Sequence, residues 1–306
     1  MNLFPAPARP PRPVTVACIQ MACSANRADN VVRAERRVRA AAAEGAQIIL
    51  LQELFETPYF CIEQSARHYD LATTLEENTT IRRFAAIARE LQVVLPLSWF
   101  ERAGRAAFNS VALIDADGAI LGVYRKSHIP NGPGYQEKQY FTPGDTGFRA
   151  WATRYGTIGV GICWDQWFPE AARAMALQGA ELLLYPSAIG TDPEMGIDAL
   201  LPWQRVMQGH AVANSMPVIA CNRIGVERSA DGTLALEFFG GSFIADQQGA
   251  LVAQADRSGE TVLIHSFDLE ACRRYREGWA LFRDRRPELY GSLLTHDGRA
   301  AGTRGG

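Results

Sequence analysis

The chain has 306 residues, a formal net charge of −2 at pH 7 and a hydrophobic content of 47%. It can therefore bury one large α/β core or two smaller ones, and its nearly neutral charge, without a basic stripe, gives no sign of a nucleic-acid partner. No apolar run approaches the length of a membrane span, so no membrane partner is expected.

The first half of the chain predicts alternating helices and strands. Residues 26–44 have the apolar spacing of an amphipathic helix that Gly45 ends, and residues 79–91 have the same spacing before another apolar run. Asp117 and Gly118 lie between two alternating runs and indicate a hairpin turn. The predicted elements of this half are helices over 26–44 and 79–91 and strands up to Leu51 and over 93–99, 107–115 and 119–124.

The second half repeats part of this pattern. Residues 241–251 echo residues 109–120, because both read as a strand that leads through an Asp-x-x-Gly-Ala turn into another strand. Two halves, each with a sheet covered by helices on one face, predict a four-layer α-β-β-α sandwich of the α/β class. The predicted elements of this half are strands over 157–162, 182–185 and 217–222 and helices over 169–178 and 203–214.

The composition along the chain predicts one domain. No Ser/Gly-rich or charged linker divides residues 14–290, so we expect a single domain there. Residues 1–13 are rich in Pro, Ala and Arg and lack an apolar stretch, which predicts a flexible lead and not a secretory signal. Residues 291–306 are rich in Gly and Arg and are expected to form a poorly ordered tail.

Cys163 follows the small and β-branched strand 157–162 and precedes the helix that Pro169 opens and Gly179 ends. A thiol on such a strand-to-helix turn is presented at the edge of a sheet, near backbone N–H groups that can receive negative charge. It is a candidate nucleophile. The alternative is that Cys163 is a small buried hydrophobic residue, as free cysteines commonly are.

Two further strand ends carry ionisable residues. Glu53 follows the apolar strand that ends at Leu51, where a carboxylate is either paired for structural reasons or held as a general base. Lys126 follows the strand over 119–124 and would be a solvated surface lysine in most proteins. With Cys163, however, these residues make a catalytic set in which the thiol attacks a carbonyl or nitrile carbon, Glu53 takes its proton and Lys126 stabilises an oxyanion.

The remaining cysteines and histidines suggest no metal site and no cofactor. The thiols have no paired metal-ligand spacing, and reduced thiols in a cytoplasmic protein are the better interpretation. A cysteine–histidine dyad stays open as an alternative, although none of the five histidines has a distinctive local context. The cysteines are Cys18, Cys23, Cys61, Cys163, Cys221 and Cys272.

The order Glu53, Lys126, Cys163, each in its local context, resembles the nitrilase superfamily of carbon–nitrogen hydrolases from about Val14 to Tyr290. The resemblance implies the same four-layer fold and a homo-oligomer. Helix 169–178, with small residues all round, either contacts another subunit or is buried in its own domain. Within the superfamily the chain is similar to the N-carbamoylputrescine amidohydrolases in four segments, which are residues 128–138, 140–148, 163–170 and 205–211.

This resemblance implies that the chain hydrolyses a small N-carbamoyl amine, namely N-carbamoylputrescine, to putrescine, carbon dioxide and ammonia. Cys163 would form a thioester-type intermediate, its pKa lowered beside Lys126, while Glu53 moves the proton. Lys126 and the backbone N–H of Trp164 would bind the oxyanion. Glu137 matches a second glutamate that hydrogen-bonds near the lysine in the family, whereas on general grounds a glutamate in this Gly/Pro-rich loop is solvated.

The substrate tail is expected to lie against the segment after the strand over 182–185. Pro186, Ser187 and Ala188 would form a wall of the pocket, Tyr59 and Trp164 would line the aliphatic stretch, and Asp192, with Glu194 in reserve, would accept the terminal ammonium. Two alternatives stay open. The first is a β-ureidopropionase or N-carbamoyl amino-acid hydrolase, which would need a cation for the substrate carboxylate, such as Arg205 or Arg223. The second is a catalytically silent interaction protein, against which the intact Glu53, Lys126 and Cys163 argue.

Overall fold

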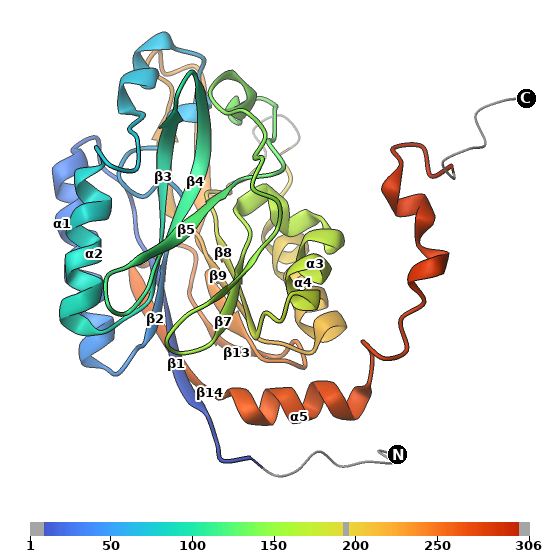
Figure 1. The fold of residues 1–306 in the computed structure, drawn as a ribbon. Coiled ribbons are helices and arrows are strands. Elements are labelled where there is room, and N and C mark those ends of the chain that lie inside the picture. Colours follow the sequence, from blue (N-terminus) through green and yellow to red (C-terminus); the bar gives the residue numbers. More distant parts are fainter. Residues whose placement is uncertain (1–8, 192–195, 300–306) are drawn as a thin grey trace, which may run out of the picture.

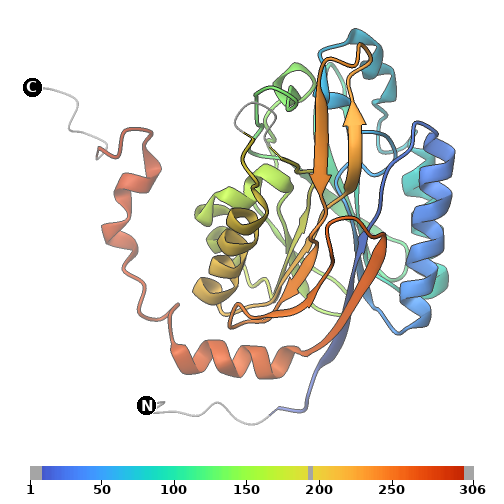
Figure 2. The ribbon, with the colours of Figure 1, turned by 180° about the vertical axis from the view of Figure 1, so that it is seen from behind.

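The computed structural model describes residues 9–191 and 196–299, which form a sandwich of four layers (Figures 1 and 2). Two sheets lie face to face, and each is covered by helices on its outer face. The predicted α-β-β-α sandwich is therefore confirmed. The covering helices are α1 (Arg27–Ala43) and α2 (Thr79–Leu91) on one sheet and α3 (Pro169–Leu177) and α4 (Leu200–Asn214) on the other.

The first sheet is mixed. The second and third strands in its spatial order pair parallel with each other. A bridge between Ile48 and Val94 joins them to an antiparallel meander of three strands. The last strand of the chain pairs antiparallel with the first. In spatial order the strands are β14 (Thr261–Asp268), β1 (Pro13–Gln20), β2 (Ile48–Leu51), β3 (Leu95–Ala103), β4 (Ala106–Ile114) and β5 (Ile120–Arg125).

The second sheet has a parallel centre of β7 (Thr157–Val160), β8 (Leu182–Pro186) and β9 (Val218–Cys221), flanked by antiparallel strands. A separate hairpin of β10 (Ile224–Arg228) and β11 (Ala235–Phe239) follows β9. In spatial order the strands of the sheet are β13 (Leu251–Gln254), β12 (Phe243–Ala245), β9 (Val218–Cys221), β8 (Leu182–Pro186), β7 (Thr157–Val160) and β6 (Ala150–Ala152).

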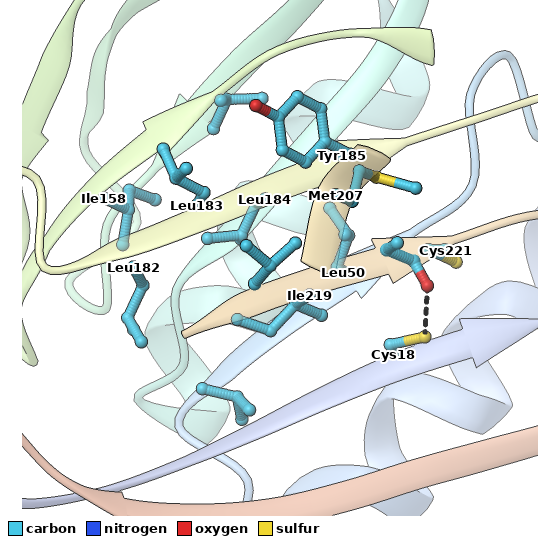
Figure 3. Packing of buried hydrophobic residues seen from close by; sticks show 14 of the residues in the cluster. Cys18, Leu50, Ile158, Leu182, Leu183, Leu184, Tyr185, Met207, Ile219 and Cys221 are labelled. Carbon is cyan, nitrogen blue, oxygen red and sulfur yellow. Dashed lines mark hydrogen bonds between the residues drawn. The ribbon is translucent and has the colours of Figure 1, made fainter. Parts of the chain in front are cut away.

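The core lies mainly between the two sheets. Strand β2 is apolar on both faces because one face packs against the other sheet and the opposite face packs against helices. Ile48 and Leu50 point into the core between the sheets, whereas Ile49 and Leu51 pack under α1 and α2. Leu50 belongs to the same buried cluster as Leu184 and Ile219 of the second sheet (Figure 3).

Local signals set most helix ends. Asn26 caps α1 by accepting a hydrogen bond from the Asp29 N–H at 3.1 Å, and Asn78 caps α2 by accepting one from the Ile81 N–H at 2.8 Å. Gly179 follows α3 with φ +95° and ends it as predicted. Helix α4 begins at Leu200, three residues before the predicted Trp203.

The remaining elements connect or extend these layers. Helix α5 (Leu269–Trp279) follows β14, and the residues after it run along the outside of the body with exposed side chains (Figures 1 and 2). The division of the chain at residues 13 and 290 stays a prediction. Among the described residues, no helix has the length and apolarity needed to cross a membrane. The 3₁₀ helices are Phe60–Ile62, Ala66–Leu71, Glu137–Gln139, Cys163–Trp167, Pro287–Leu289 and Gly291–Leu294.

Helix α3 buries most of its small residues within its own domain. Ala171, Ala172, Met175 and Ala176 are buried, the latter three in the core of the second sheet. Burial within the domain explains why these side chains are small. For them, the alternative that the helix contacts another subunit is not needed.

Candidate active site

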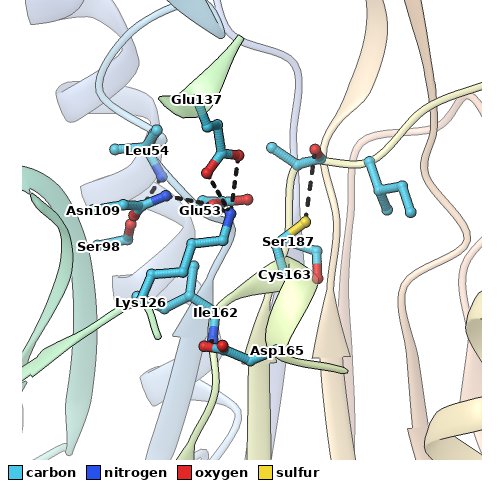
Figure 4. Close-up of polar contacts among 12 residues, drawn as sticks. Glu53, Leu54, Ser98, Asn109, Lys126, Glu137, Ile162, Cys163, Asp165 and Ser187 are labelled. Carbon is cyan, nitrogen blue, oxygen red and sulfur yellow. Dashed lines mark hydrogen bonds and ion pairs between the residues drawn. The ribbon is translucent and has the colours of Figure 1, made fainter. Parts of the chain in front are cut away.

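Three strand ends bring the predicted catalytic residues together (Figure 4). Glu53 follows β2, Lys126 directly follows β5, and Cys163 opens the 3₁₀ helix after β7. Glu53 and Lys126 are fully buried, and Cys163 is 4% exposed. The first two come from one sheet and the thiol comes from the other, so the site lies where the two sheets meet.

Lys126 is held between two carboxylates. Its Nζ lies 2.8 Å from Glu53 Oε1 and 2.7 and 2.9 Å from the two oxygens of Glu137. Burial alone would lower the pKa of Lys126, but the charges of Glu137 and Glu53 outweigh it and the pKa lies well above its ordinary value. Lys126 is therefore a fixed ammonium, and Glu137 is buried, not solvated.

Glu137 has a perturbed pKa of its own. Burial raises the pKa of its carboxyl to about 7, and the nearby charge of Glu53 acts in the same direction. Lys126 and the hydroxyl of Tyr59, which donates to Glu137 Oε1 at 2.5 Å, oppose this rise. The ionised form of Glu137 thus depends on two identified partners.

Glu53 keeps one oxygen free. Its Oε1 accepts from Lys126 and, at 2.6 Å, from the Asn109 amide. Its Oε2 is buried and has no hydrogen-bond partner within the described part of the chain. A buried acceptor without a partner is unusual in a native fold, and this oxygen is free to take a proton from a thiol or a water.

The turn at Cys163 is strained and held in place. Cys163 has φ +42°, a conformation that costs a non-glycine residue on the order of 1–3 kcal/mol. The carboxylate of Asp165 stabilises the turn, because Oδ2 accepts from the Ile162 N–H at 2.9 Å and from Tyr124 Oη at 2.7 Å. Oδ1 accepts from the His128 N–H at 3.0 Å. Asp165 thereby joins the turn at Cys163 to the segment that carries Lys126.

The pKa of the Cys163 thiol is raised, contrary to the lowered pKa expected from the sequence. Burial and the charge of Glu53 raise the pKa of Cys163 well above its ordinary value, and Lys126 opposes this only in part. Burial is the main cause, because a thiolate loses its hydration in the interior, and the nearby carboxylate of Glu53 disfavours a second negative charge. A thiol with a raised pKa needs a neighbouring base to accept its proton before it can act as a nucleophile.

The predicted substrate residues lie in different situations. Tyr59 is buried with its hydroxyl on Glu137, so it supports the cluster. The Ala188 carbonyl lies 3.9 Å from Cys163 Sγ, and Ser187 donates to Gln166 at 3.0 Å. Pro186 ends β8, and the Trp164 side chain is 38% exposed. Asp192 and Glu194 lie outside the described residues.

The two arginines considered for a substrate carboxylate differ sharply. Arg205 is exposed on α4, whereas Arg223 is fully buried and donates to three backbone carbonyls and to Glu227. No histidine in the described ranges is hydrogen-bonded to Cys163, and His128 instead lies 2.8 Å from Asp165 through Nδ1. The cysteine–histidine alternative therefore receives no support.

Sequence reasoning missed Asn109 and Asp165 as parts of the site. Asn109 is a fully buried amide beside Ser110 in the middle of the mostly apolar strand β4. An amide in such a strand is a usable signal because, once buried, it requires a hydrogen-bond partner. Asp165 lies two residues after Cys163, but nothing local indicates that its carboxylate reaches back to Ile162 and across to Tyr124.

Comparison with known proteins agrees with this geometry. The model of the carbon–nitrogen hydrolase family matches residues 15–277. An N-carbamoylputrescine amidase of Oryza sativa subsp. japonica is 56% identical, over 93% of this chain and 96% of the relative. A citrullinase of Francisella tularensis subsp. tularensis is 51% identical, over 92% of this chain and 98% of the relative.

A solved structure shows the same architecture. The carbon–nitrogen hydrolase from Helicobacter pylori G27 superposes with a TM-score of 0.87 at 40% sequence identity, covering 93% of this chain and 99% of that one. The match of the family model over most of the chain, together with these relatives, decides the family. The chain belongs to the carbon–nitrogen hydrolases of the nitrilase superfamily and is an enzyme of that class.

Proposed function

We propose that this enzyme hydrolyses N-carbamoylputrescine to putrescine, carbon dioxide and ammonia. The observation that carries the proposal is the buried set of Glu53, Lys126, Glu137 and Cys163, in a chain 56% identical to a plant N-carbamoylputrescine amidase over nearly its whole length. Hydrolysis of a ureido group needs a nucleophile, a proton shuttle and a donor for an oxyanion, and the cluster contains one group for each task.

The first half of the reaction forms a covalent intermediate. Cys163 Sγ attacks the ureido carbon while its proton passes to Glu53, whose free Oε2 is the acceptor. The carbonyl oxygen becomes an oxyanion, and the tetrahedral intermediate collapses as Glu53 returns the proton to the departing nitrogen. The product is a thioester-type acyl enzyme and one molecule of ammonia or amine.

In the second half, water replaces the departed nitrogen compound. Glu53 takes a proton from the water as the oxygen attacks the acyl carbon, and the thiol leaves with that proton. The released carbamate loses carbon dioxide and gives the second nitrogen product. Each step returns Glu53 and Cys163 to their starting protonation states.

Lys126 and the backbone N–H of Trp164 stabilise the oxyanion in this proposal. Lys126 is fixed by two carboxylates, so its ammonium is in place before the charge develops. Trp164 is the second residue of the 3₁₀ helix Cys163–Trp167, a position whose N–H has no partner within the helix. Glu137 keeps Lys126 protonated and oriented.

The substrate tail is proposed to run along the segment after β8. Pro186, Ser187 and Ala188 adjoin the thiol through the Ala188 carbonyl, which supports this proposal. Trp164 and Tyr59 would line the aliphatic stretch of the tail. We propose that Asp192, or in its place Glu194, accepts the terminal ammonium. Asp192→Asn should weaken binding of N-carbamoylputrescine about ten- to a hundredfold and leave an uncharged N-carbamoyl alkylamine nearly unaffected.

A second candidate substrate is citrulline, because a citrullinase is 51% identical to this chain. Citrulline carries a ureido group on a chain that ends in an α-amino acid, so it needs a cation for its carboxylate. Buried Arg223 already serves protein carbonyls and Glu227, and exposed Arg205 lies on an outer helix. These positions favour the diamine derivative over citrulline and over N-carbamoyl-β-alanine, the substrate of the β-ureidopropionase alternative.

A substrate comparison tests this proposal. Ammonia release should be measured with N-carbamoylputrescine, citrulline, N-carbamoyl-β-alanine and an uncharged N-carbamoyl butylamine. The highest kcat/KM is expected with N-carbamoylputrescine. A preference for N-carbamoyl-β-alanine or citrulline would contradict the substrate assignment, and no turnover of any of them, with no labelling of Cys163 by substrate, would favour a catalytically silent protein.

We further propose a cytoplasmic homo-oligomer with a place in polyamine biosynthesis. All six cysteines are free thiols, which suits a reducing compartment. Exposed apolar side chains on α3 and α4 support an interface there, since Leu177, Leu201 and Val212 are 49%, 53% and 51% exposed. Light scattering at micromolar concentration tests the assembly.

A further inference from the structure

Arg223 is a fully buried arginine in the connection between β9 and β10, behind the catalytic cluster. Its guanidinium lies over the ring of Phe238 at 5.3 Å and near that of Tyr59 at 5.8 Å. An arginine is almost never buried completely unless its donors are used. The positions of those donors suggest what the residue does.

One arm of the guanidinium holds the main chain of the general base. Arg223 Nη2 donates to the carbonyl oxygen of Glu53 at 2.8 Å and to that of Leu54 at 3.0 Å. Leu54 has φ +48°, a left-handed conformation that leucine rarely adopts without external support. The strained turn that aims the Glu53 side chain is therefore stabilised by donors from the connection between β9 and β10, far away along the chain.

The other arm of the guanidinium is connected through Glu227 and Tyr59 to Glu137, the second carboxylate beside Lys126. Arg223 Nη1 donates to Glu227 Oε1 at 2.8 Å, and the other oxygen of Glu227 accepts from the backbone N–H of Tyr59. The Tyr59 hydroxyl in turn donates to Glu137 at 2.5 Å. The buried ion pair of Arg223 and Glu227 thus contacts the main chain of Glu53 and that of Tyr59, whose hydroxyl holds Glu137.

We propose that Arg223 is a positioning residue that fixes Glu53 directly, through its backbone, and Glu137 indirectly, through Glu227 and Tyr59. The inference rests on the proposed function in one respect, since it takes Glu53 as the proton shuttle. A planar guanidinium with donors in a rigid fork can serve two carbonyls and a carboxylate at once, whereas the ammonium of a lysine cannot match that geometry. In this proposal Arg223 acts through Glu53 and Glu137 and makes no contact with the substrate.

The test compares Arg223→Lys and Arg223→Ala with wild type on whichever ureido substrate the wild type hydrolyses. Displacement of a catalytic group by about 1 Å can cost about 10²-fold in rate, so kcat of each variant should fall by about that factor with little change in KM. Low concentrations of guanidinium chloride, well below those that unfold the protein, should restore part of the kcat of Arg223→Ala and none of that of Arg223→Lys.

Arg276→Ala is the matched control. Arg276 is half-buried on α5 and also donates to two backbone carbonyls, those of Ser215 and Ala180, each at 3.3 Å. Its loss should lower Tm, while kcat per folded molecule, with the folded fraction taken from near-UV circular dichroism, should stay at the wild-type value.

Three results would overturn the inference. They are a raised KM confined to substrates with a carboxylate, a kcat per folded molecule equal to wild type in Arg223→Ala, and an absence of rescue by guanidinium in a variant that remains folded. A wild type that turns over citrulline but not N-carbamoylputrescine would contradict the substrate assignment alone, because the comparison of kcat values would still be made on citrulline.

Discussion

Tyr59→Phe should change the pH dependence of the enzyme more than its affinity for substrate. The variant removes a single hydroxyl, which donates to Glu137 Oε1 at 2.5 Å in a fully buried setting. Burial raises the pKa of Glu137 to about 7, and the Tyr59 hydroxyl is one of the contacts that keep it from rising further. Burial also raises the pKa of Tyr59 well above its ordinary value, so the phenol is a donor throughout the working range.

The magnitude follows from the strength of that hydrogen bond. A hydrogen bond to a charged acceptor contributes about 1.5–3 kcal/mol, and about 1.4 kcal/mol corresponds to one pH unit, so the acidic limb of kcat should move up by about 1 to 2 pH units. In wild type that limb should lie near pH 7, where Glu137 is half ionised. At pH 7 the variant should therefore keep about a fifth to a fiftieth of the wild-type kcat, and most of the loss should be regained near pH 9.

Stopped-time ammonia assays from pH 5.5 to 9.5 measure this shift. Tyr155→Phe is the matched control, because the Tyr155 hydroxyl also donates at 2.5 Å but to the Gln92 carbonyl, away from the site. Its profile should coincide with that of wild type. If Tyr59→Phe lowered kcat equally at every pH, or changed only KM, the inference that ionised Glu137 supports Lys126 would be refuted.

Four further substitutions test the remaining parts of the site. Cys163→Ser should lose nearly all turnover, while circular dichroism should show that the fold is kept. Appreciable activity of the variant would remove the thiol from the mechanism. Glu53→Gln should lower kcat by about 10²-fold or more with a nearly unchanged KM, and an effect on KM alone would make Glu53 a binding residue. Lys126→Met should cost a similar factor in kcat and about 3–5 kcal/mol of stability, because two buried carboxylates lose their cation. Without Lys126 the pKa of Glu137 rises further, so the variant should lose stability as pH increases from about 5 to 8. A Tm deficit independent of pH would contradict this. Gly144→Ala should lower kcat, since a Cβ there would lie 2.1 Å from the carbonyl oxygen of Arg125, next to Lys126, and an unchanged rate would show that this contact does not position the lysine.

Much of the fold was predictable because local signals and burial agree. The helices over 26–44 and 79–91 have asparagine caps that the structure uses, and the turns at Asp115 and Asp246 are built alike, each with a glycine three residues later in a left-handed conformation. The hairpin of β10 and β11 and helix α5 were not predicted. Their sequences carry weaker apolar patterns, since β10 alternates buried and exposed residues unevenly and α5 buries only three side chains.

The site was predictable as a set of strand ends but not as a network. Glu53, Lys126 and Cys163 each follow an apolar strand, and a strand end is visible in a single sequence. The interactions that tune them join residues far apart along the chain, such as Arg223 and Glu53, 170 positions apart. The raised pKa of Cys163 was missed for the same reason, because it depends on the burial and on the net charge of the assembled cluster.

The pairing of β1 with β14 has a consequence for how the protein is made. Pro13 lies opposite Asp268 and Gln20 opposite Thr261, so one edge of β1 stays unpaired until the ribosome has released almost the entire described chain. An unpaired strand edge on a nascent polypeptide is a site for wrong pairing with other chains, and contacts so distant in sequence form slowly. Production yield should therefore depend strongly on chaperones and on temperature during synthesis, and a circular permutant that connects β14 directly to β1 should relieve that dependence.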